Sequence, residues 1–258
     1  MKKYILDLRV SQNVCLSADC SLLKVTFEEN ILPPMKAGQF VQIAVNDSKT
    51  TYLRRPISIC YVDRTSNELW LLIRKAGAGT DALIHSEIDD EINMILPLGN
   101  GFTIPEDSNK KALLVGGGVG VAPLLYLGND LKNRGIDVTF LLGAKSRNDL
   151  LLLDEFKAIS TVVLSTDDGS YGESGLVTNN SILNNEKFDL IYCCGPLPMM
   201  KSVAKIAKEK GIECEVSLEN TMACGIGACL CCVEDTKDEG NVCVCKDGPV
   251  FNINRLKW

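Results

Sequence analysis

The sequence contains a single histidine, His85, among 258 residues. Histidine is a common metal ligand and the usual proton relay for serine and cysteine nucleophiles. One copy nearly excludes a histidine-ligated metal site and a histidine-based nucleophile relay. His85 itself is expected to be an ordinary, partly exposed residue.

Excess positive charge and long apolar runs are also missing. The net charge is −6, so binding to nucleic acid or to an anionic membrane by bulk electrostatics is not expected. No apolar run reaches membrane-spanning length, and the first residues enter a strand-like pattern without a secretory leader. We expect a cytoplasmic protein, long enough for two domains and a small third.

Cysteine, by contrast, is abundant. Twelve cysteines without a secretion signal indicate a reducing compartment and metal chemistry. Cys224, Cys229 and Cys232 have the spacing C-x4-C-x2-C, followed by a distant fourth cysteine, which is the plant-type spacing for a 2Fe–2S cluster. Gly225 and Gly227 allow the loop to fold closely around the cluster. The alternatives are a zinc site and inert buried cysteines; the four-residue gap and the glycines favour the cluster.

Two of the ligand positions have a competing neighbour. Cys231 would leave a one-residue gap after the preceding ligand, so we choose Cys232. Asp247-Gly248-Pro249 is typical of a turn that holds the residue before it in place, so we choose Cys245 over Cys243, although the competing cysteines remain alternatives. The predicted metal ligands are Cys224, Cys229, Cys232 and Cys245.

The first hundred residues have a pattern of short β-strands. The predicted strands are residues 1–10, 22–28, 40–45, 57–62, 69–75 and 92–96. Pro33-Pro34, Asn46-Asp47 and residues 77–79 separate them, and only residues 81–88 have the pattern of a short helix. Many short strands between turns predict a small barrel or sandwich.

Two stretches in this β-rich part have the chemistry of a phosphate site. Arg55-Pro56-Ile57-Ser58, preceded by Arg54, can hold a phosphate and donate to a ring nitrogen; the alternative is a solvated basic pair. At Gly79-Thr80 a glycine-rich turn leads into the predicted helix, with Thr80 as its cap and free N–H groups that attract phosphate; the alternative is a plain helix-entry loop. Together they suggest a pyrophosphate between Arg55 and the Gly79-Thr80 turn.

After Lys110 the pattern changes to strands that alternate with helices. A buried strand at residues 111–115 ends in the glycine-rich turn 116–120, and a helix follows at 124–134, as in a nucleotide-binding βαβ unit. The turn is not the standard G-x-G-x-x-G, and no acidic residue follows at the expected interval. A tight turn without a ligand is therefore the alternative.

The alternation continues with strands at residues 138–142, 161–165 and 188–193 and helices at 148–158 and 202–210. This order predicts a parallel sheet, whose ligands bind at the carboxyl ends of the strands. Three specialised loops lie there, and we expect a dinucleotide to cross them. The candidate residues are Gly117, Gly118, Gly120, Asp168, Cys194, Gly195 and Pro196. Cys194 either faces a cofactor ring or packs at the strand end.

The last segment begins with a strand at residues 213–218. The cysteine loop follows, then an acidic turn at 234–240 and a hairpin that carries Cys245. The segment is too short to bury a core, so a metal centre would have to hold it together.

This order of parts resembles the ferredoxin–NADP reductase superfamily. Over its full length the chain more closely resembles the electron-transfer subunits of dihydroorotate dehydrogenase B, and the cysteine motif is the most specific part of the match. The motifs concerned are Arg55-Pro56-Ile57-Ser58, residues 117–124, residues 166–172, Cys194-Gly195-Pro196, residues 217–220 and residues 222–229. The resemblance implies a multidomain β plus α/β protein: an FAD-binding antiparallel β-barrel (1–104), a parallel-sheet NAD-binding α/β domain (105–213) and a 2Fe–2S segment (214–258).

The resemblance also implies which residues hold the flavin, and the same four cysteines as cluster ligands. The FAD-binding residues would be Arg55, Pro56, Ile57, Ser58, Leu72, Ile73, Arg74, Gly79 and Thr80. The implied partner is an FMN-containing subunit that oxidises dihydroorotate in pyrimidine biosynthesis, in a heterotetramer with two copies of each chain. Electrons would pass from FMN through the cluster to FAD and then as hydride to NAD+, since a flavin exchanges one electron or two.

Other functions are compatible with parts of this pattern. NAD rather than NADP rests on the resemblance alone, because Lys145 and Arg147 lie near the expected place of a 2′-phosphate. A related NAD(P)H-dependent ferredoxin or polysulfide oxidoreductase subunit often has Asp at the first ligand position, where this chain has Cys224. A cluster-based redox sensor and a zinc-stabilised binding protein are the alternatives from other classes.

Overall fold

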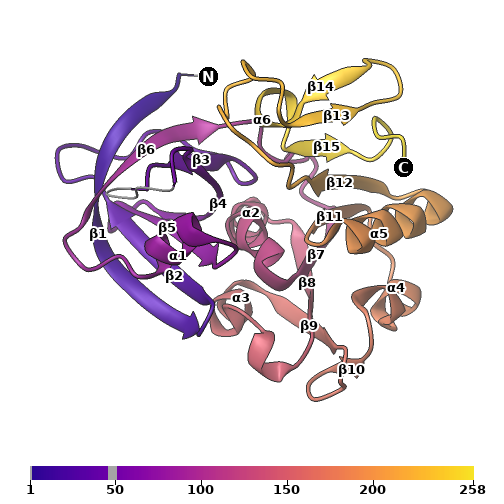
Figure 1. The fold of residues 1–258 in the computed structure, drawn as a ribbon. Helices are drawn as coiled ribbons and strands as arrows, with labels where there is room; N and C mark the ends of the chain where they lie inside the picture. The colour runs from indigo at the N-terminus through magenta and orange to yellow at the C-terminus, as the bar shows by residue number, and fades with distance from the viewer. Residues whose placement is uncertain (1, 46–50) are drawn as a thin grey trace. The chain divides into compact units, whose positions relative to one another are not determined.

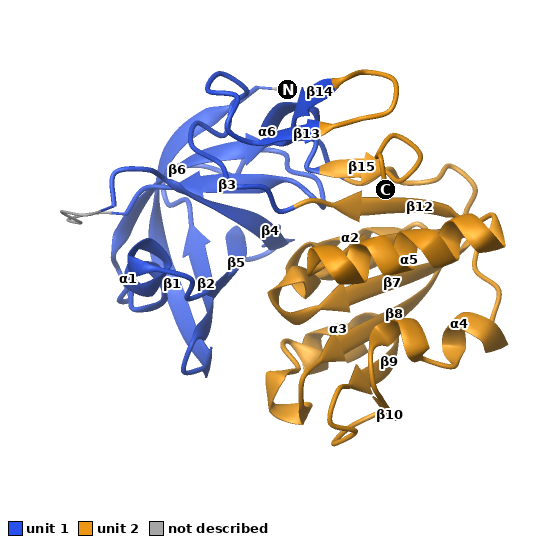
Figure 2. Ribbon diagram, turned by 45° about the vertical axis from the view of Figure 1, so that its right-hand side comes forward, with its two compact units in different colours: residues 1–101, 219–234, 241–249 blue, residues 102–218, 235–240, 250–258 orange. Residues whose placement is uncertain are grey.

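The computed structural model describes residues 2–45 and 51–258 (Figure 1). The chain forms two compact units, coloured separately in Figure 2. Unit 1 comprises Met1–Gly101, Glu219–Glu234 and Asn241–Pro249, and unit 2 comprises Phe102–Leu218, Asp235–Gly240 and Val250–Trp258. The predicted break at Asn46-Asp47 lies outside the described residues. Across the two described stretches, every helix is too short or too polar to cross a membrane.

Unit 1 is built on a closed antiparallel barrel with the strand order β1-β2-β5-β4-β3-β6. The strands are β1 (Tyr4–Ser17), β2 (Cys20–Thr26), β3 (Phe40–Ile43), β4 (Arg55–Asp63), β5 (Glu68–Arg74) and β6 (Glu91–Leu98). Alternate residues such as Leu8, Val41 and Leu71 are fully buried inside it. All six predicted strands are present. Because they form one closed sheet, the unit is a barrel and not a sandwich.

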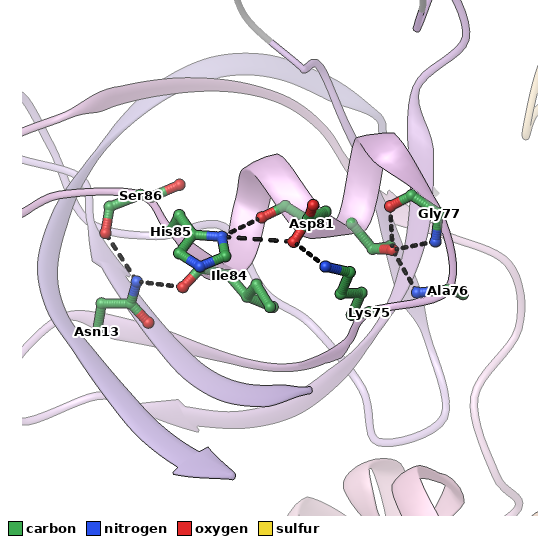
Figure 3. A network of polar contacts seen from close by, with 9 residues as sticks. Asn13, Lys75, Ala76, Gly77, Asp81, Ile84, His85 and Ser86 are labelled. Carbon is green, nitrogen blue, oxygen red and sulfur yellow. Dashed lines mark hydrogen bonds and ion pairs between the residues drawn. The ribbon is translucent and has the colours of Figure 1, made fainter. Parts of the chain in front are cut away.

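Strand β1 continues well beyond the predicted end at residue 10 because its polar second half finds partners. The Ser11 hydroxyl donates to Glu68 Oε1 at 2.7 Å. Asn13 Nδ2 donates to the carbonyl oxygens of Ile84 (3.1 Å) and Ser86 (2.7 Å), as Figure 3 shows. A polar run that sequence patterning treats as a loop is therefore held in the sheet by cross-barrel hydrogen bonds.

Helix α1 (Ala78–Ile84) begins three residues earlier than predicted. Thr80 lies inside its first turn, where the Oγ1 atom accepts the N–H groups of Ala76 (2.7 Å) and Gly77 (3.2 Å). Thr80 therefore caps the helix from within and does not precede it.

The Asp81 carboxylate forms an ion pair with Lys75 Nζ at 2.9 Å (Figure 3). His85 Nδ1 donates to the Asp81 carbonyl oxygen at 2.7 Å, and the His85 side chain is 73% exposed. The single histidine is thus an ordinary surface residue at a helix end, as expected.

Unit 2 contains a seven-stranded sheet in the order β10-β9-β8-β7-β11-β12-β15. Its strands are β7 (Lys111–Gly117), β8 (Asp137–Ala144), β9 (Thr161–Thr166), β10 (Glu173–Ser174), β11 (Leu190–Cys194), β12 (Glu213–Ser217) and β15 (Val250–Asn252). The helices are α2 (Ala122–Asn133), α3 (Leu153–Ile159), α4 (Ile182–Asn185) and α5 (Leu197–Lys210), with short 3-10 turns at Gly118–Val121, Arg147–Asp149 and Val177–Asn179. Six of these strands, β7, β8, β9, β10, β11 and β12, pair in parallel, which confirms the predicted α/β sheet.

The predicted helix at residues 148–158 is divided in two. The Asp149 carboxylate accepts both the N–H (3.0 Å) and the hydroxyl (2.7 Å) of Ser146, so the first turn closes on itself. Leu152 then has a φ of 54°, and α3 starts only at Leu153. A side chain that satisfies its own turn ends the helix there.

The C-terminal segment differs from the prediction in two respects. Strands β13 (Val233–Asp235) and β14 (Asn241–Cys243) form the hairpin, but Cys245 lies after it, in the single helical turn α6 (Val244–Asp247). The strand β15 was not predicted, and it pairs antiparallel with β12. The buried side chains of Phe251, Ile253 and Leu256 give the tail a core within unit 2, so the segment does not depend on a metal centre alone.

Candidate functional site

The four predicted metal ligands all lie in unit 1, and all twelve cysteines are free thiols. The loop after Cys224 turns its backbone toward that residue. The N–H groups of Ile226 (3.4 Å), Ala228 (3.3 Å) and Cys229 (3.4 Å) all donate to Cys224 Sγ. Three converging N–H groups are the environment that a thiolate needs.

The ligand sulfurs are arranged as two pairs. Cys229 is hydrogen-bonded to Cys224 through its backbone N–H, which donates to Cys224 Sγ, and Cys245 contacts Cys232 in the same way. The N–H of Cys245 donates to Cys232 Sγ (3.3 Å), and the N–H of Gly227 donates to Cys245 Sγ (3.1 Å). Among the described residues, no three His, Cys, Asp or Glu side chains gather around one point. Two pairs of thiols fit the ligand set of a two-iron cluster.

The neighbouring cysteines have different surroundings. Cys231 is exposed. Cys243 is buried, its N–H donates to Asp247 Oδ2 at 2.9 Å, and burial raises the pKa of its thiol. The hydrogen bonds between sulfur and backbone N–H that link the loop to α6 run through Cys232 and Cys245.

The pKa values of Cys224 and Cys245 are shifted in opposite directions. Burial opposes ionisation of Cys224, but its N–H donors outweigh burial and lower its pKa to about 6. Burial raises the pKa of Cys245, and its hydrogen bond with Cys232 raises it further. The N–H donors thus favour the ionised form of Cys224, which is the form in which a cysteine binds a metal.

The cysteine loop is packed against barrel strand β3. Gly225 has a φ of 68°, and a Cβ built on it would lie 2.6 Å from both Cγ and Nε2 of Gln42. On the far side of the segment, Asn100 N–H donates to the Gly248 carbonyl oxygen at 2.6 Å. Gln42 was not singled out from the sequence, because no local pattern marks a contact between residues so far apart along the chain.

The predicted flavin residues come together on β4, β5 and α1. A Cβ on Gly79 would lie 3.0 Å from Arg55 Cδ, so the first turn of α1 lies beside the Arg55 side chain. Arg55 Nη2 donates to the Leu53 carbonyl oxygen (2.9 Å), and Arg55 Nε is buried with no hydrogen-bond partner among the described residues. An unpaired guanidinium nitrogen beside a helix start fits a phosphate group.

The other predicted flavin residues take less uniform positions. Pro56, Ile57 and Ser58 follow Arg55 along β4. Leu72 and Ile73 are buried in the barrel, where they pair with Leu22 and Ser21 of β2. Arg74 is partly exposed and pairs with Asp19 at 3.2 Å.

Two of the three predicted nucleotide loops touch each other at the carboxyl ends of β7 and β11. A Cβ on Gly120 would lie 2.5 Å from Gly195 Cα, and one on Gly117 would lie 2.6 Å from Met199 Sδ. Cys194 is buried at the end of β11. Gly118 begins the 3-10 turn after β7, and Pro196 directly precedes α5.

The third loop, which contains Asp168, is hydrogen-bonded to the residue that follows β8. Asp168 N–H donates to the Lys145 carbonyl oxygen at 3.2 Å. The Asp168 carboxylate accepts the Ser170 hydroxyl (2.6 Å) and N–H (2.9 Å), and these hydrogen bonds lower its pKa. The Ser170 hydroxyl in turn accepts the N–H of Arg147 at 2.8 Å.

Comparison with known proteins gives matches over most of the chain. Residues 219–257 match the model for the iron-sulfur cluster binding domain of dihydroorotate dehydrogenase B, and residues 114–205 match the model for the oxidoreductase NAD-binding domain. The electron transfer subunit of dihydroorotate dehydrogenase B (NAD(+)) from Lysinibacillus sphaericus is 40% identical over 90% of this chain and 91% of its own length. The corresponding subunit from Clostridium perfringens is 40% identical over 95% of this chain and 94% of its own length.

Solved structures share the fold. A structure of NADH-dependent reduced ferredoxin–NADP oxidoreductase has a TM-score of 0.87 and 28% identity, over 97% of this chain and 90% of that one. A cytochrome P450 reductase from Amycolatopsis has a TM-score of 0.69 at 23% identity, over 81% of this chain and 66% of that one. The latter supports the fold alone.

Proposed function

This chain belongs to the family of dihydroorotate dehydrogenase B electron transfer subunits, and on that premise we propose that it passes electrons from a dihydroorotate-oxidising subunit to NAD+. The observation that carries the proposal is the placement of two cysteine pairs and the Arg55 phosphate site within one compact unit. When bound, a flavin exchanges single electrons with an iron–sulfur cluster and hydride with a nicotinamide.

The chain's own residues then have separate tasks. Cys224, Cys229, Cys232 and Cys245 would hold the cluster, as the hydrogen bonds from Cys229 N–H to Cys224 Sγ and from Cys245 N–H to Cys232 Sγ support. The backbone N–H groups that donate to these sulfurs stabilise the negative charge of the thiolates.

The flavin and the nicotinamide nucleotide are held by separate parts of the chain. Arg55 Nε and the backbone at Gly79-Thr80 hold the FAD pyrophosphate, while β4 from Pro56 to Ser58 lines the flavin. The nucleotide lies at the carboxyl ends of the parallel strands, against residues with little or no side chain in the way. We assign this role to Gly117, Gly118, Gly120, Cys194, Gly195 and Pro196, with Asp168 shaping the neighbouring loop.

By ligand, we assign residues 1–104 to FAD, 105–213 to NAD and 214–258 to the cluster, and the last of these segments contributes to both compact units. The partner is an FMN-containing catalytic subunit, in a cytoplasmic heterotetramer with two copies of each chain, as part of pyrimidine biosynthesis. Ile226 and Leu230 on the cysteine loop are 44% and 65% exposed. Exposed apolar side chains beside a redox centre support a protein partner at this loop.

The experiment co-expresses the chain with its candidate partner and follows dihydroorotate-dependent reduction of NAD+. We expect the purified chain alone to retain FAD that NADH bleaches. In the complex, Cys229→Ser should abolish NAD+-linked dihydroorotate oxidation, and Cys15→Ser, at an exposed cysteine of the barrel, should leave it unchanged. A flavin that NADH does not bleach would refute the hydride step, and full activity of Cys229→Ser would refute the route through the cluster.

A further inference from the structure

The side-chain amide of Gln42, in unit 1, has no hydrogen-bond partner among the residues that the structure describes. The Gln42 side chain is fully buried on β3. Neither Oε1 nor Nε2 has a hydrogen-bond partner among the described residues. A buried amide that makes no hydrogen bond costs free energy, so the folded protein is expected to supply a partner from outside the chain.

The amide of Gln42 is directed at the cysteine loop. The built Cβ of Gly225, the residue directly after Cys224, lies 2.6 Å from Gln42 Nε2. Only a glycine at position 225 leaves room for this approach. Around the same loop, backbone N–H groups already donate to Cys224 Sγ and Cys245 Sγ, so the acceptors that gather here are sulfurs.

The side chains of the cross-strand neighbours of Gln42 provide no hydrogen-bond partner for its amide. In the barrel register Gln42 pairs with Pro56 on β4 and with Ile95 on β6. Neither side chain can donate or accept a hydrogen bond. The amide is thus enclosed between apolar strand neighbours and the loop that follows the first cluster ligand.

We propose that Gln42 donates an N–H···S hydrogen bond from Nε2 to the iron–sulfur centre and thereby raises its reduction potential. The inference rests on the proposed cluster in this loop. Reduction adds one electron and so one negative charge to the centre. A hydrogen-bond donor to sulfur stabilises that added charge, and such hydrogen bonds are among the determinants of cluster potential.

Gln39 provides a matched control close to Gln42 in the chain. It is equally buried, but its amide is satisfied within the barrel. Gln39 Oε1 accepts the N–H of Lys36 and Gln39 Nε2 donates to the Gly99 carbonyl oxygen, each at 2.8 Å. We therefore expect Gln39 to contribute to folding alone. The same substitution at the two glutamines should change the cluster potential only at Gln42.

The first test is a redox titration of the holoprotein, in which EPR monitors the cluster and absorbance monitors FAD. In Gln42→Met we expect the ratio of reduced to oxidised cluster at a fixed potential to fall about three- to tenfold, tenfold being about 59 mV for one electron. The FAD potential should stay unchanged. Gln39→Met should lower the melting temperature without shifting the cluster potential. An unshifted cluster potential in Gln42→Met, or a shift confined to FAD, would overturn the proposal.

A second measurement needs no substitution in the protein observed. Wild-type protein labelled with ¹⁵N in its glutamine side chains should show magnetic coupling between the reduced cluster and one amide nitrogen in pulsed EPR, and Gln39→Met should retain it. Absence of that coupling in protein with full iron and sulfide would contradict the role of Gln42. Absence of iron and sulfide from the wild-type protein would instead refute the proposed function itself.

Discussion

At the scale of single residues, Gly225 is where the cysteine loop and the barrel meet most closely. Its φ of 68° and its contact with Gln42 both exclude a side chain. Gly240 has nearly the same φ, 67°, but a Cβ there would meet nothing within 4 Å. Comparing substitutions at these two glycines therefore distinguishes the cost of a positive φ from the cost of close packing.

We expect Gly225→Ala to lose most of its cluster, and Gly240→Ala to keep it. Both substitutions carry roughly 1–2 kcal/mol of left-handed strain. Only Gly225→Ala adds an overpacking cost of about 1–3 kcal/mol, because Gln42 is buried and cannot move aside. Iron and acid-labile sulfide per chain are the readout, and equal cluster content in the two variants would contradict this account.

Arg55 is the second residue with a specific prediction. A charge-assisted hydrogen bond to a phosphate contributes about 1.5–3 kcal/mol, so Arg55→Met should weaken FAD binding roughly ten- to hundredfold. Arg64→Met is the control, because the Arg64 guanidinium donates to the Leu32 and Pro33 carbonyl oxygens within the barrel. Fluorescence titration of FAD into flavin-free protein measures both. Wild-type affinity in Arg55→Met would place the flavin phosphates elsewhere.

At the scale of secondary-structure elements, the turn after β7 depends on contact between two backbones. A Cβ on Gly120 would lie 2.5 Å from Gly195 Cα, and neither backbone can yield without moving the end of β7 or β11. Gly120→Ala should therefore raise the KM for NADH about tenfold, equivalent to roughly 1.4 kcal/mol, with FAD content unchanged. Gly211→Ala, in open space after α5, should leave this KM at its wild-type value. A wild-type KM in Gly120→Ala would argue against a nucleotide at this edge.

The strand β15 gives a prediction about metal removal. Ile253 N–H donates to the Cys214 carbonyl oxygen at 3.0 Å, and β15 pairs with β12. Chelation of the iron should accelerate hydrogen exchange at Gly227 and Cys245, whose N–H groups donate to sulfur, about tenfold or more. The amides of Phe251 and Ile253 should stay protected. Loss of their protection on chelation would show that the metal holds the whole tail.

The elements also show what the sequence can and cannot predict. Strands with alternating burial and the glycine turn after β7 have local patterns that predict them, although the polar second half of β1 has none. Strand β15 was missed because three residues carry no periodicity, and its pairing with β12 is tertiary. The helical turn at Cys245 is also too short to have a periodic pattern, so the sequence predicted a hairpin there. The cysteine spacing indicates the metal chemistry, but Gln42 is visible only once the loop is folded onto β3.

At the scale of the whole molecule, the C-terminal segment is shared between the two units. The two stretches that carry the four candidate ligands belong to unit 1, with the barrel, whereas residues 214–218, 235–240 and 250–258 belong to unit 2, with the parallel sheet. The proposed cluster ligands thus lie in the same unit as Arg55 and the proposed flavin strand β4. One-electron transfer between cluster and flavin then depends on packing inside a single unit.

The central claim is that four particular sulfurs of this chain hold two irons and two sulfides. Its most direct test is iron and acid-labile sulfide analysis of anaerobically purified protein, with Cys231→Ser and Cys232→Ser as a neighbouring pair. We predict two irons and two sulfides per chain in the wild type and in Cys231→Ser, and a loss of most of both in Cys232→Ser. Wild-type protein without iron and sulfide, or a loss in Cys231→Ser with retention in Cys232→Ser, would contradict the account.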